Sequence, residues 1–174
     1  MANLSYKYNI VPLLVAIFCT LFFGSVSLVY PFGVDQGIFA YIASQLLEGQ
    51  KLYQDVFDIK PPPTFYMFSL ALFSFGHTML SIRIVDLLWQ SAIAVLIFLI
   101  TSRIYQKQAI GMLSVFLYVI SYYGRPHADT AQTDGFLSLP LTLGILAFLV
   151  ARDRQSNRWF FFCGLAIGVA TLFK

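Results

Sequence analysis

The sequence predicts an all-α membrane protein with about five transmembrane helices and an amphipathic first outer loop. Hydrophobic residues make up 59% of the chain and charged residues 11%, and the mean hydropathy is +0.76. This composition is typical of a chain whose solvent is lipid. The net charge of +3 is spread over loops without a basic run, which argues against nucleic acid as a partner.

Five apolar segments are predicted to cross the hydrocarbon core, which requires a helix of about twenty residues. Apolar character after Lys7 continues through Tyr30, so we interpret the first segment as a retained span rather than a cleaved signal peptide. The predicted spans are residues 10–30, 80–101, 108–123, 135–151 and 159–174. The apolar piece 64–75 would rise only about 18 Å as a helix, so we expect it in or along the interface.

The distribution of Lys and Arg favours this five-span topology, because short cytoplasmic loops are enriched in these residues. With a cytoplasmic N-terminus, the inner cations are Lys7, Arg103, Lys107, Arg152, Arg154 and Arg158. Counting 64–75 as a sixth span would move all of them except Lys7 to the outer face. The first loop, residues 31–79, and the connection 123–134 are therefore predicted to share the non-cytoplasmic side.

An amphipathic helix is predicted in the first loop, beginning at Asp35 and ending at Gly49. Its apolar positions at helical spacing are Ile38, Tyr41, Ile42 and Leu46. Two interpretations of Asp35 stand together. It is the N-cap of the helix, or it is a reactive carboxylate that the cap position orients.

Lys60 is followed directly by three prolines, residues 61–63, which stiffen the backbone and hold the lysine at a defined place. One interpretation of Lys60 is a snorkelling interfacial side chain. The other is a cation that binds a phosphate in the headgroup layer. Asp58 is either a solvated loop residue or part of the same site.

The connection before the fourth span carries His127, Asp129 and Asp134. Their nitrogen and oxygen atoms are candidate ligands for a divalent cation. The spacing matches no strong metal signature, and solvated loop residues are the alternative interpretation.

Four further polar residues lie close to the predicted spans. Arg83 and Asp86 are one helical turn apart, and we expect them to pair near the outer end of the second span. Lys174 ends a span that runs outward, so it should lie near the outer mouth. His77 has no evident partner and is interpreted as part of an interfacial turn.

Taken together, the motifs resemble the integral-membrane glycosyltransferases of the GT-C class, in particular the branch of protein O-mannosyltransferases and aminoarabinose-transferase-like proteins. The resemblance covers nearly the whole chain. Its blocks are Asp35-Gln36-Gly37 through Lys60-Pro61-Pro62, Ala131-Gln132-Thr133-Asp134-Gly135, and Gly164-Leu165-Ala166-Ile167-Gly168 with Lys174. Many relatives carry Glu at the position of Gln36.

This resemblance implies transfer of a sugar from a polyprenyl-phosphate carrier to an acceptor at the outer face of the cell membrane, with inversion at the anomeric carbon. Asp35 matches the first-loop acid of the family and is the expected catalytic base. Lys60 matches the lysine that contacts the carrier phosphate. Asp58 and Asp134 are the further candidates for substrate binding. Some members of the wider class use a divalent cation.

Relatives have more spans than residues 1–174 supply, so the chain corresponds to the N-terminal part of such a domain. A fragment, a truncated product and one part of a split enzyme with a C-terminal partner are all open interpretations. The competing function is a non-catalytic membrane subunit that binds a carrier lipid, or a piece of a transporter. Transporters often contain inverted repeats, and this sequence has no evident repeat.

Overall fold

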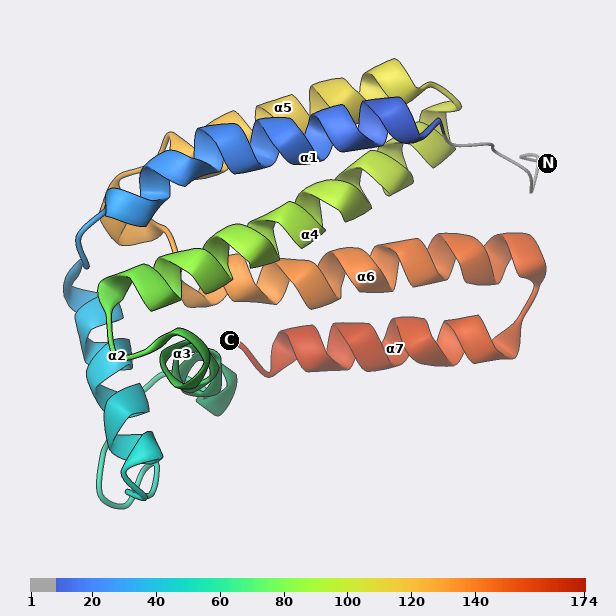
Figure 1. Cartoon of the computed structure of the whole chain (residues 1–174). Helices are drawn as coiled ribbons and strands as arrows, with labels where there is room; N and C mark the ends of the chain where they lie inside the picture. Colours follow the sequence, from blue (N-terminus) through green and yellow to red (C-terminus); the bar gives the residue numbers. More distant parts are fainter. Residues whose placement is uncertain (1–8) are drawn as a thin grey trace.

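The computed structural model describes residues 9–174, and these residues form an all-helical fold (Figure 1). The α-helices are α1 (Ile10–Gly24), α2 (Val34–Leu47), α3 (Pro62–Phe75), α4 (Met79–Tyr105), α5 (Gln108–Tyr123), α6 (Thr133–Arg154) and α7 (Asn157–Thr171), and the short 3-10 helices are η1 (Ser25–Val29) and η2 (His127–Asp129). Within residues 9–174 no strand forms, and the predicted all-α class is confirmed.

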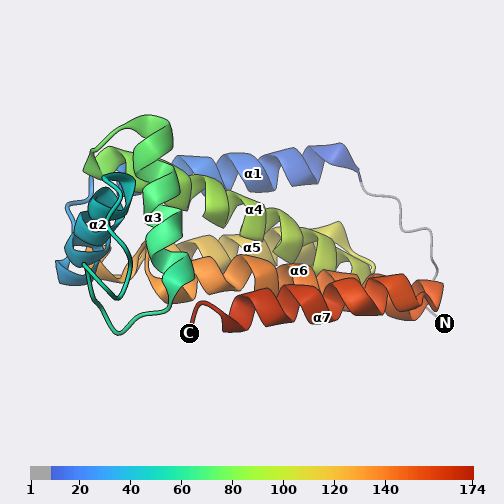
Figure 2. The same cartoon turned by 90° about the horizontal axis from the view of Figure 1, so that it is seen from below.

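Five of the helices, α1, α4, α5, α6 and α7, run side by side along one long axis, whereas α2 and α3 lie crosswise at one end (Figures 1 and 2). Among residues 9–174, three segments are long and apolar enough to cross a membrane, namely Ile10–Val29, Met79–Tyr105 and Thr133–Arg154. Helix α5 is apolar but shorter, and α7 has 15 residues. The five long-axis helices coincide with the five predicted spans, and their passage through a membrane stays a prediction.

An aromatic cluster fastens the crosswise helices to the end of the bundle. The ring of Phe39 in α2 lies edge-on to Phe65 and Phe68 of α3, with centroid distances of 5.7 and 5.6 Å. Phe68 contacts Phe136 of α6 at 6.2 Å, and Phe136 contacts Trp89 of α4 at 5.9 Å. Such edge-to-face pairs contribute about 0.5–1.5 kcal/mol each beyond their buried area. The rings therefore fix α2 and α3 against α4 and α6.

Helix α2 begins differently from the prediction. Its N-cap is Gly33, and Asp35 lies in the first turn. The side-chain oxygen of Gln36 accepts a hydrogen bond from the Gly33 backbone N–H. The prediction that Asp35 is the N-cap of this helix is therefore wrong. The end of the helix is as expected, because Gly49 adopts a left-handed φ of 92° after the last turn.

The buried face of α2 agrees only in part with the predicted one. Ile42 is buried as expected, together with Phe39 and Ala43, whereas Ile38 and Tyr41, which were also expected on the apolar face, are 39% and 62% exposed. Apolar residues occur on both sides of this helix, so hydropathy alone did not distinguish them. The packing of α3 and the aromatic cluster selects the face that is buried.

Helix α3 starts at Pro62, inside the run of three prolines. Proline is tolerated in the first turn because its missing N–H would have no intrahelical partner there. The helix ends at Gly76, whose φ is 89°. In the following turn His77 Nδ1 lies 3.3 Å from Ser44 Oγ of α2, so the expectation that His77 has no partner is wrong.

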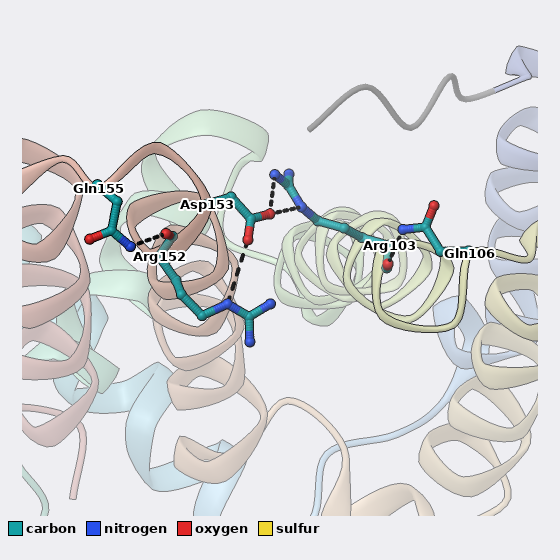
Figure 3. A network of polar contacts seen from close by, with 5 residues as sticks. All are labelled: Arg103, Gln106, Arg152, Asp153 and Gln155. Carbon is teal, nitrogen blue, oxygen red and sulfur yellow. Dashed lines mark hydrogen bonds and ion pairs between the residues drawn. The ribbon is translucent and has the colours of Figure 1, made fainter. Parts of the chain in front are cut away.

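At the opposite end of the bundle, charged side chains join α4 to α6 (Figure 3). Asp153 Oδ2 accepts hydrogen bonds from Nε and an amino nitrogen of Arg103 at 3.2 and 2.9 Å. Arg152 Nε lies 3.5 Å from the other oxygen of Asp153. The side chains of Gln106 and Gln155 each donate to the carbonyl of the arginine three residues before them. This end of the structure is therefore polar and predominantly cationic.

Candidate active site

A cleft of about 1370 Å³ opens at the end of the bundle that α2 and α3 cover. Its wall combines the start of α2, the segment before α3, the end of α5, the start of α6 and the end of the chain. Its charged residues are Asp35, Lys60, Arg125, Asp129, Asp134 and Lys174. Residues from the first loop and from the connection before α6 thus line one cleft, as the predicted topology requires.

Asp35 lies in the first turn of α2, where the positive end of the helix dipole favours a carboxylate. Its side chain is exposed, faces the cleft, and makes no hydrogen bond to any described residue. An exposed carboxylate without an internal partner retains its capacity to accept a proton or a hydroxyl hydrogen bond. The structure therefore leaves Asp35 available for chemistry at the cleft wall.

Lys60 is held by two contacts to its backbone. Its N–H donates to Asp58 Oδ1 at 2.8 Å, and its carbonyl accepts from the Tyr53 hydroxyl at 2.7 Å. Burial, together with the charge of Asp58 and the nearby Tyr66, raises the pKa of Tyr53, so the hydroxyl keeps its proton as a donor. Asp58 does not line the cleft. Its carboxylate fixes the loop conformation that brings Lys60 to the wall.

Asp134 occupies the first turn of α6, and its Oδ1 accepts a hydrogen bond from Lys174 Nζ at 3.1 Å. Lys174 was predicted near the outer mouth; the contact places it at the same end of the structure as Asp134, and the side of the membrane that this end faces stays a prediction. Both side chains are largely exposed, so the pair is screened by water and contributes little to stability. The hydroxyl of Thr64 in α3 donates to that of Thr133 at 3.3 Å, which joins the Lys60 segment to the Asp134 segment.

The three metal-ligand candidates do not form one ligand group. Asp129 and Asp134 line the cleft, whereas the ring of His127 packs edge-on to Tyr30 at 6.3 Å. In residues 9–174 no set of three His, Cys, Asp or Glu side chains is arranged to hold a metal ion. A divalent cation stays a prediction.

Gln36 is buried and joins the start of α2 to the loop before α6, a role that the sequence did not reveal. Its side-chain nitrogen donates to the carbonyls of His127 and Ala128, at 3.1 and 3.3 Å, and to the carbonyl of Thr130. Gln36 does not line the cleft, whereas its neighbour Asp35 does. The available signal was the i, i+3, i+7 spacing of Gln36 with Phe39 and Ala43, which places it on the buried face.

Arg83 is the second residue with an unexpected role. The predicted pair with Asp86 is wrong, because the fully buried guanidinium donates to the Pro31 carbonyl at 2.6 Å and to Thr130 Oγ1 at 2.7 Å. The rings of Tyr30 and Phe32 pack near it, with centroids 5.9 and 5.8 Å away. Arg83 therefore connects the entry to α2 with the loop before α6.

Comparison with known proteins gives one match. The family model described as dolichyl-phosphate-mannose-protein mannosyltransferase matches residues 59–174, which is more than half of the chain. The matched region contains Lys60, Asp134 and Lys174, whereas Asp35 and Asp58 precede it. Neither the curated proteins nor the solved structures gave a match.

Proposed function

The chain belongs to the dolichyl-phosphate-mannose-protein mannosyltransferase family, and from that premise we propose that it transfers a sugar from a polyprenyl-phosphate carrier to an acceptor at the outer face of the membrane. Family membership supports a membrane glycosyltransferase of the GT-C type. The observation that supports a polyprenyl-phosphate donor and transfer at the outer face is the cleft that Asp35, Lys60 and Asp134 all line. The dolichyl-phosphate-mannose of the family description makes polyprenyl-phosphate mannose the first donor to test.

The reaction needs a proton acceptor on one side of the sugar and a cation on the other. The acceptor hydroxyl attacks the anomeric carbon, and its proton passes to the carboxylate of Asp35. The bond between the anomeric carbon and the phosphate oxygen breaks, and its electron pair stays on the phosphate. Lys60 neutralises this leaving group. Asp58 acts on Lys60 through the backbone, and Asp134 contacts substrate at the other wall.

The charge distribution supports an orientation for this reaction. The end opposite the cleft carries Arg103, Lys107, Arg152, Arg154 and Arg158 at the junctions of α4 with α5 and of α6 with α7. Short loops rich in Lys and Arg favour the cytoplasmic side. We therefore propose a multi-pass cell-membrane protein whose cleft opens outward. Lys7, which was predicted to be cytoplasmic, lies outside the described residues.

Labelling of single cysteines, introduced after Cys19 and Cys163 have been replaced by alanine, tests the orientation independently of activity. A cysteine introduced at Lys51, in the loop before α3, should react with an impermeant reagent added outside intact cells. A cysteine at Arg158, at the start of α7, should react only after the membrane is opened. Reaction of both from the outside would contradict the proposed topology.

Asp35→Asn tests the catalytic base. Release of polyprenyl phosphate from the sugar donor in the presence of acceptor should fall about 10²-fold or more. Asp55→Asn is the matched control, because Asp55 lies outside the cleft and caps a turn through the Lys51 N–H at 2.8 Å, a bond that asparagine also accepts. Near-normal transfer by Asp35→Asn would remove the assignment of the base.

Lys60→Ala tests binding of the carrier phosphate. A hydrogen bond to a charged group contributes about 1.5–3 kcal/mol, so the dissociation constant for the lipid-linked donor should rise about tenfold to a hundredfold. Lys51→Ala, an exposed lysine of the same loop that does not line the cleft, should leave the constant unchanged. Equal donor affinity of the two variants would count against a phosphate contact.

The competing proposal is a non-catalytic subunit that binds the carrier lipid. It predicts the same loss of affinity for Lys60→Ala but no turnover in any variant. The partner proposed for this chain is a C-terminal part of the same domain, either in frame or as a separate protein. Donor turnover should therefore be assayed in the intact protein together with any product encoded directly downstream.

A further inference from the structure

The carboxylate of Asp86 is fully buried near the start of α4, inside a segment that is long and apolar enough to cross a membrane. Its Oδ1 accepts hydrogen bonds from Gln90 Nε2 at 2.8 Å and from the Tyr122 hydroxyl at 2.7 Å. Its Oδ2 has no hydrogen-bond partner among the described residues. A buried carboxylate is expensive in such a segment, and residues of this kind commonly serve a function.

Tyr122 carries the contact of Asp86 onward to the loop before α6. Its hydroxyl donates to Asp86 and accepts a hydrogen bond from the Ala131 backbone N–H at 3.0 Å. Ala131 is fully buried and has a φ of 52°. This left-handed conformation is unfavourable for a residue with a Cβ and persists only where the surroundings hold it. A hydroxyl that donates a hydrogen bond is also a stronger acceptor, so the bond from Tyr122 to Asp86 strengthens the bond from the Ala131 N–H.

The turn at Ala131 leads directly into the cleft wall. Helix α6 begins two residues later at Thr133, and Asp134 lies in its first turn. Tyr122 itself lines the cleft and packs against this turn, because a Cβ added at Gly135 would lie 2.9 Å from the tyrosine oxygen. The same hydroxyl therefore contacts the backbone before Asp134 and the surface immediately after it.

We propose that Asp86, acting through Tyr122, is a positioning residue for sugar transfer, because it holds the Ala131 turn and so determines where Asp134 stands at the cleft. This inference rests on the proposed function. Asp86 does not line the cleft, so its effect on the reaction passes through the tyrosine hydroxyl and the backbone of α6. The carboxylate supplies an acceptor of fixed position, and an amide oxygen in the same place would serve equally.

The test compares four substitutions in the intact protein reconstituted in nanodiscs. Tyr122→Phe removes the hydroxyl that bridges the two elements. Tyr123→Phe is the matched control, because the hydroxyl of Tyr123 has no hydrogen-bond partner in the described part of the chain. Asp86→Asn retains an acceptor oxygen, and Asp86→Leu removes it.

Two measurements are made on each variant: hydrogen exchange of the peptide that contains Ala131, and steady-state sugar transfer. Tyr122→Phe and Asp86→Leu should exchange about tenfold faster in that peptide because the amide loses its partner. They should also lower kcat about tenfold or more, since small displacements of a positioned group reduce rates strongly. The KM for the donor should stay within about twofold, because Lys60 lies on a separate loop. Asp86→Asn and Tyr123→Phe should resemble the unmodified protein.

Unchanged exchange in Tyr122→Phe would overturn the inference, and so would faster exchange with normal kcat. Loss of transfer in Asp86→Asn with normal exchange would overturn it as well, because charge rather than position would then matter. If the unmodified protein turns over no sugar donor in the presence of its partner, the proposed function fails. The exchange data would still decide separately whether Tyr122 holds the turn.

Discussion

Replacement of Gln36 by Met should remove the hydrogen bonds that join the first loop to the loop before α6. The substitution keeps the length and roughly the volume of the side chain, and the two residues have similar helix propensities. It removes the acceptor for the Gly33 N–H and the amide that donates to the carbonyls of residues 127, 128 and 130. The amide has two N–H groups, so about three hydrogen bonds are lost, each worth about 1 kcal/mol. We expect a loss of about 3 kcal/mol in the free energy of unfolding.

The measurement is reversible unfolding in mixed detergent micelles, followed by tryptophan fluorescence. Gln45→Met is the control, because Gln45 lies on the same helix and makes only an exposed contact to Glu48. Its free energy of unfolding should change by less than about 0.5 kcal/mol. Equal stabilities of the two variants would refute the reasoning that the hydrogen bonds of Gln36 stabilise the contact between two distant loops.

Two further predictions concern packing and charge away from the cleft. Gly111→Ala should destabilise the protein by about 1–3 kcal/mol in the same titration, because the added Cβ overlaps Ser102 Oγ of α4. Gly168→Ala meets nothing within 4 Å and should be neutral or stabilising by up to about 1 kcal/mol; the reverse order would contradict the α4–α5 contact. Asp153→Ala should lower stability by about 1 kcal/mol, because it removes the partner of Arg103. It should leave donor affinity at the distant cleft unchanged, and a weakened affinity would mean that the two ends are coupled.

The candidate site was predictable as a list of residues but not as an arrangement. Asp35, Lys60 and Asp134 were identified from the sequence, and all three line the cleft. Asp58 was identified with them, yet its carboxylate holds the Lys60 backbone instead. Side-chain type indicates which chemistry a residue can perform, whereas the direction of a side chain depends on loop conformations that no periodicity describes.

The polar residues inside the bundle show the same limit. One helical turn separates Arg83 from Asp86, so local spacing favoured a pair between them. Arg83 instead bonds to Pro31 and Thr130, and Asp86 bonds to Tyr122. Buried polar groups take whichever partners complete their hydrogen bonds, and here those partners are far away in the chain.

The sequence by itself determined that this protein is helical, apolar and built from about five long segments. The reason is local. Lipid offers no water to the backbone, so each apolar segment satisfies its backbone hydrogen bonds within its own helix. Only the tertiary structure decided which face of α2 is buried, which loops Gln36 joins and which charges share a cleft. Those outcomes depend on contacts such as the bond from Gln36 to Thr130, 94 residues apart, which exist only in the packed structure and leave no mark in the local spacing of residues.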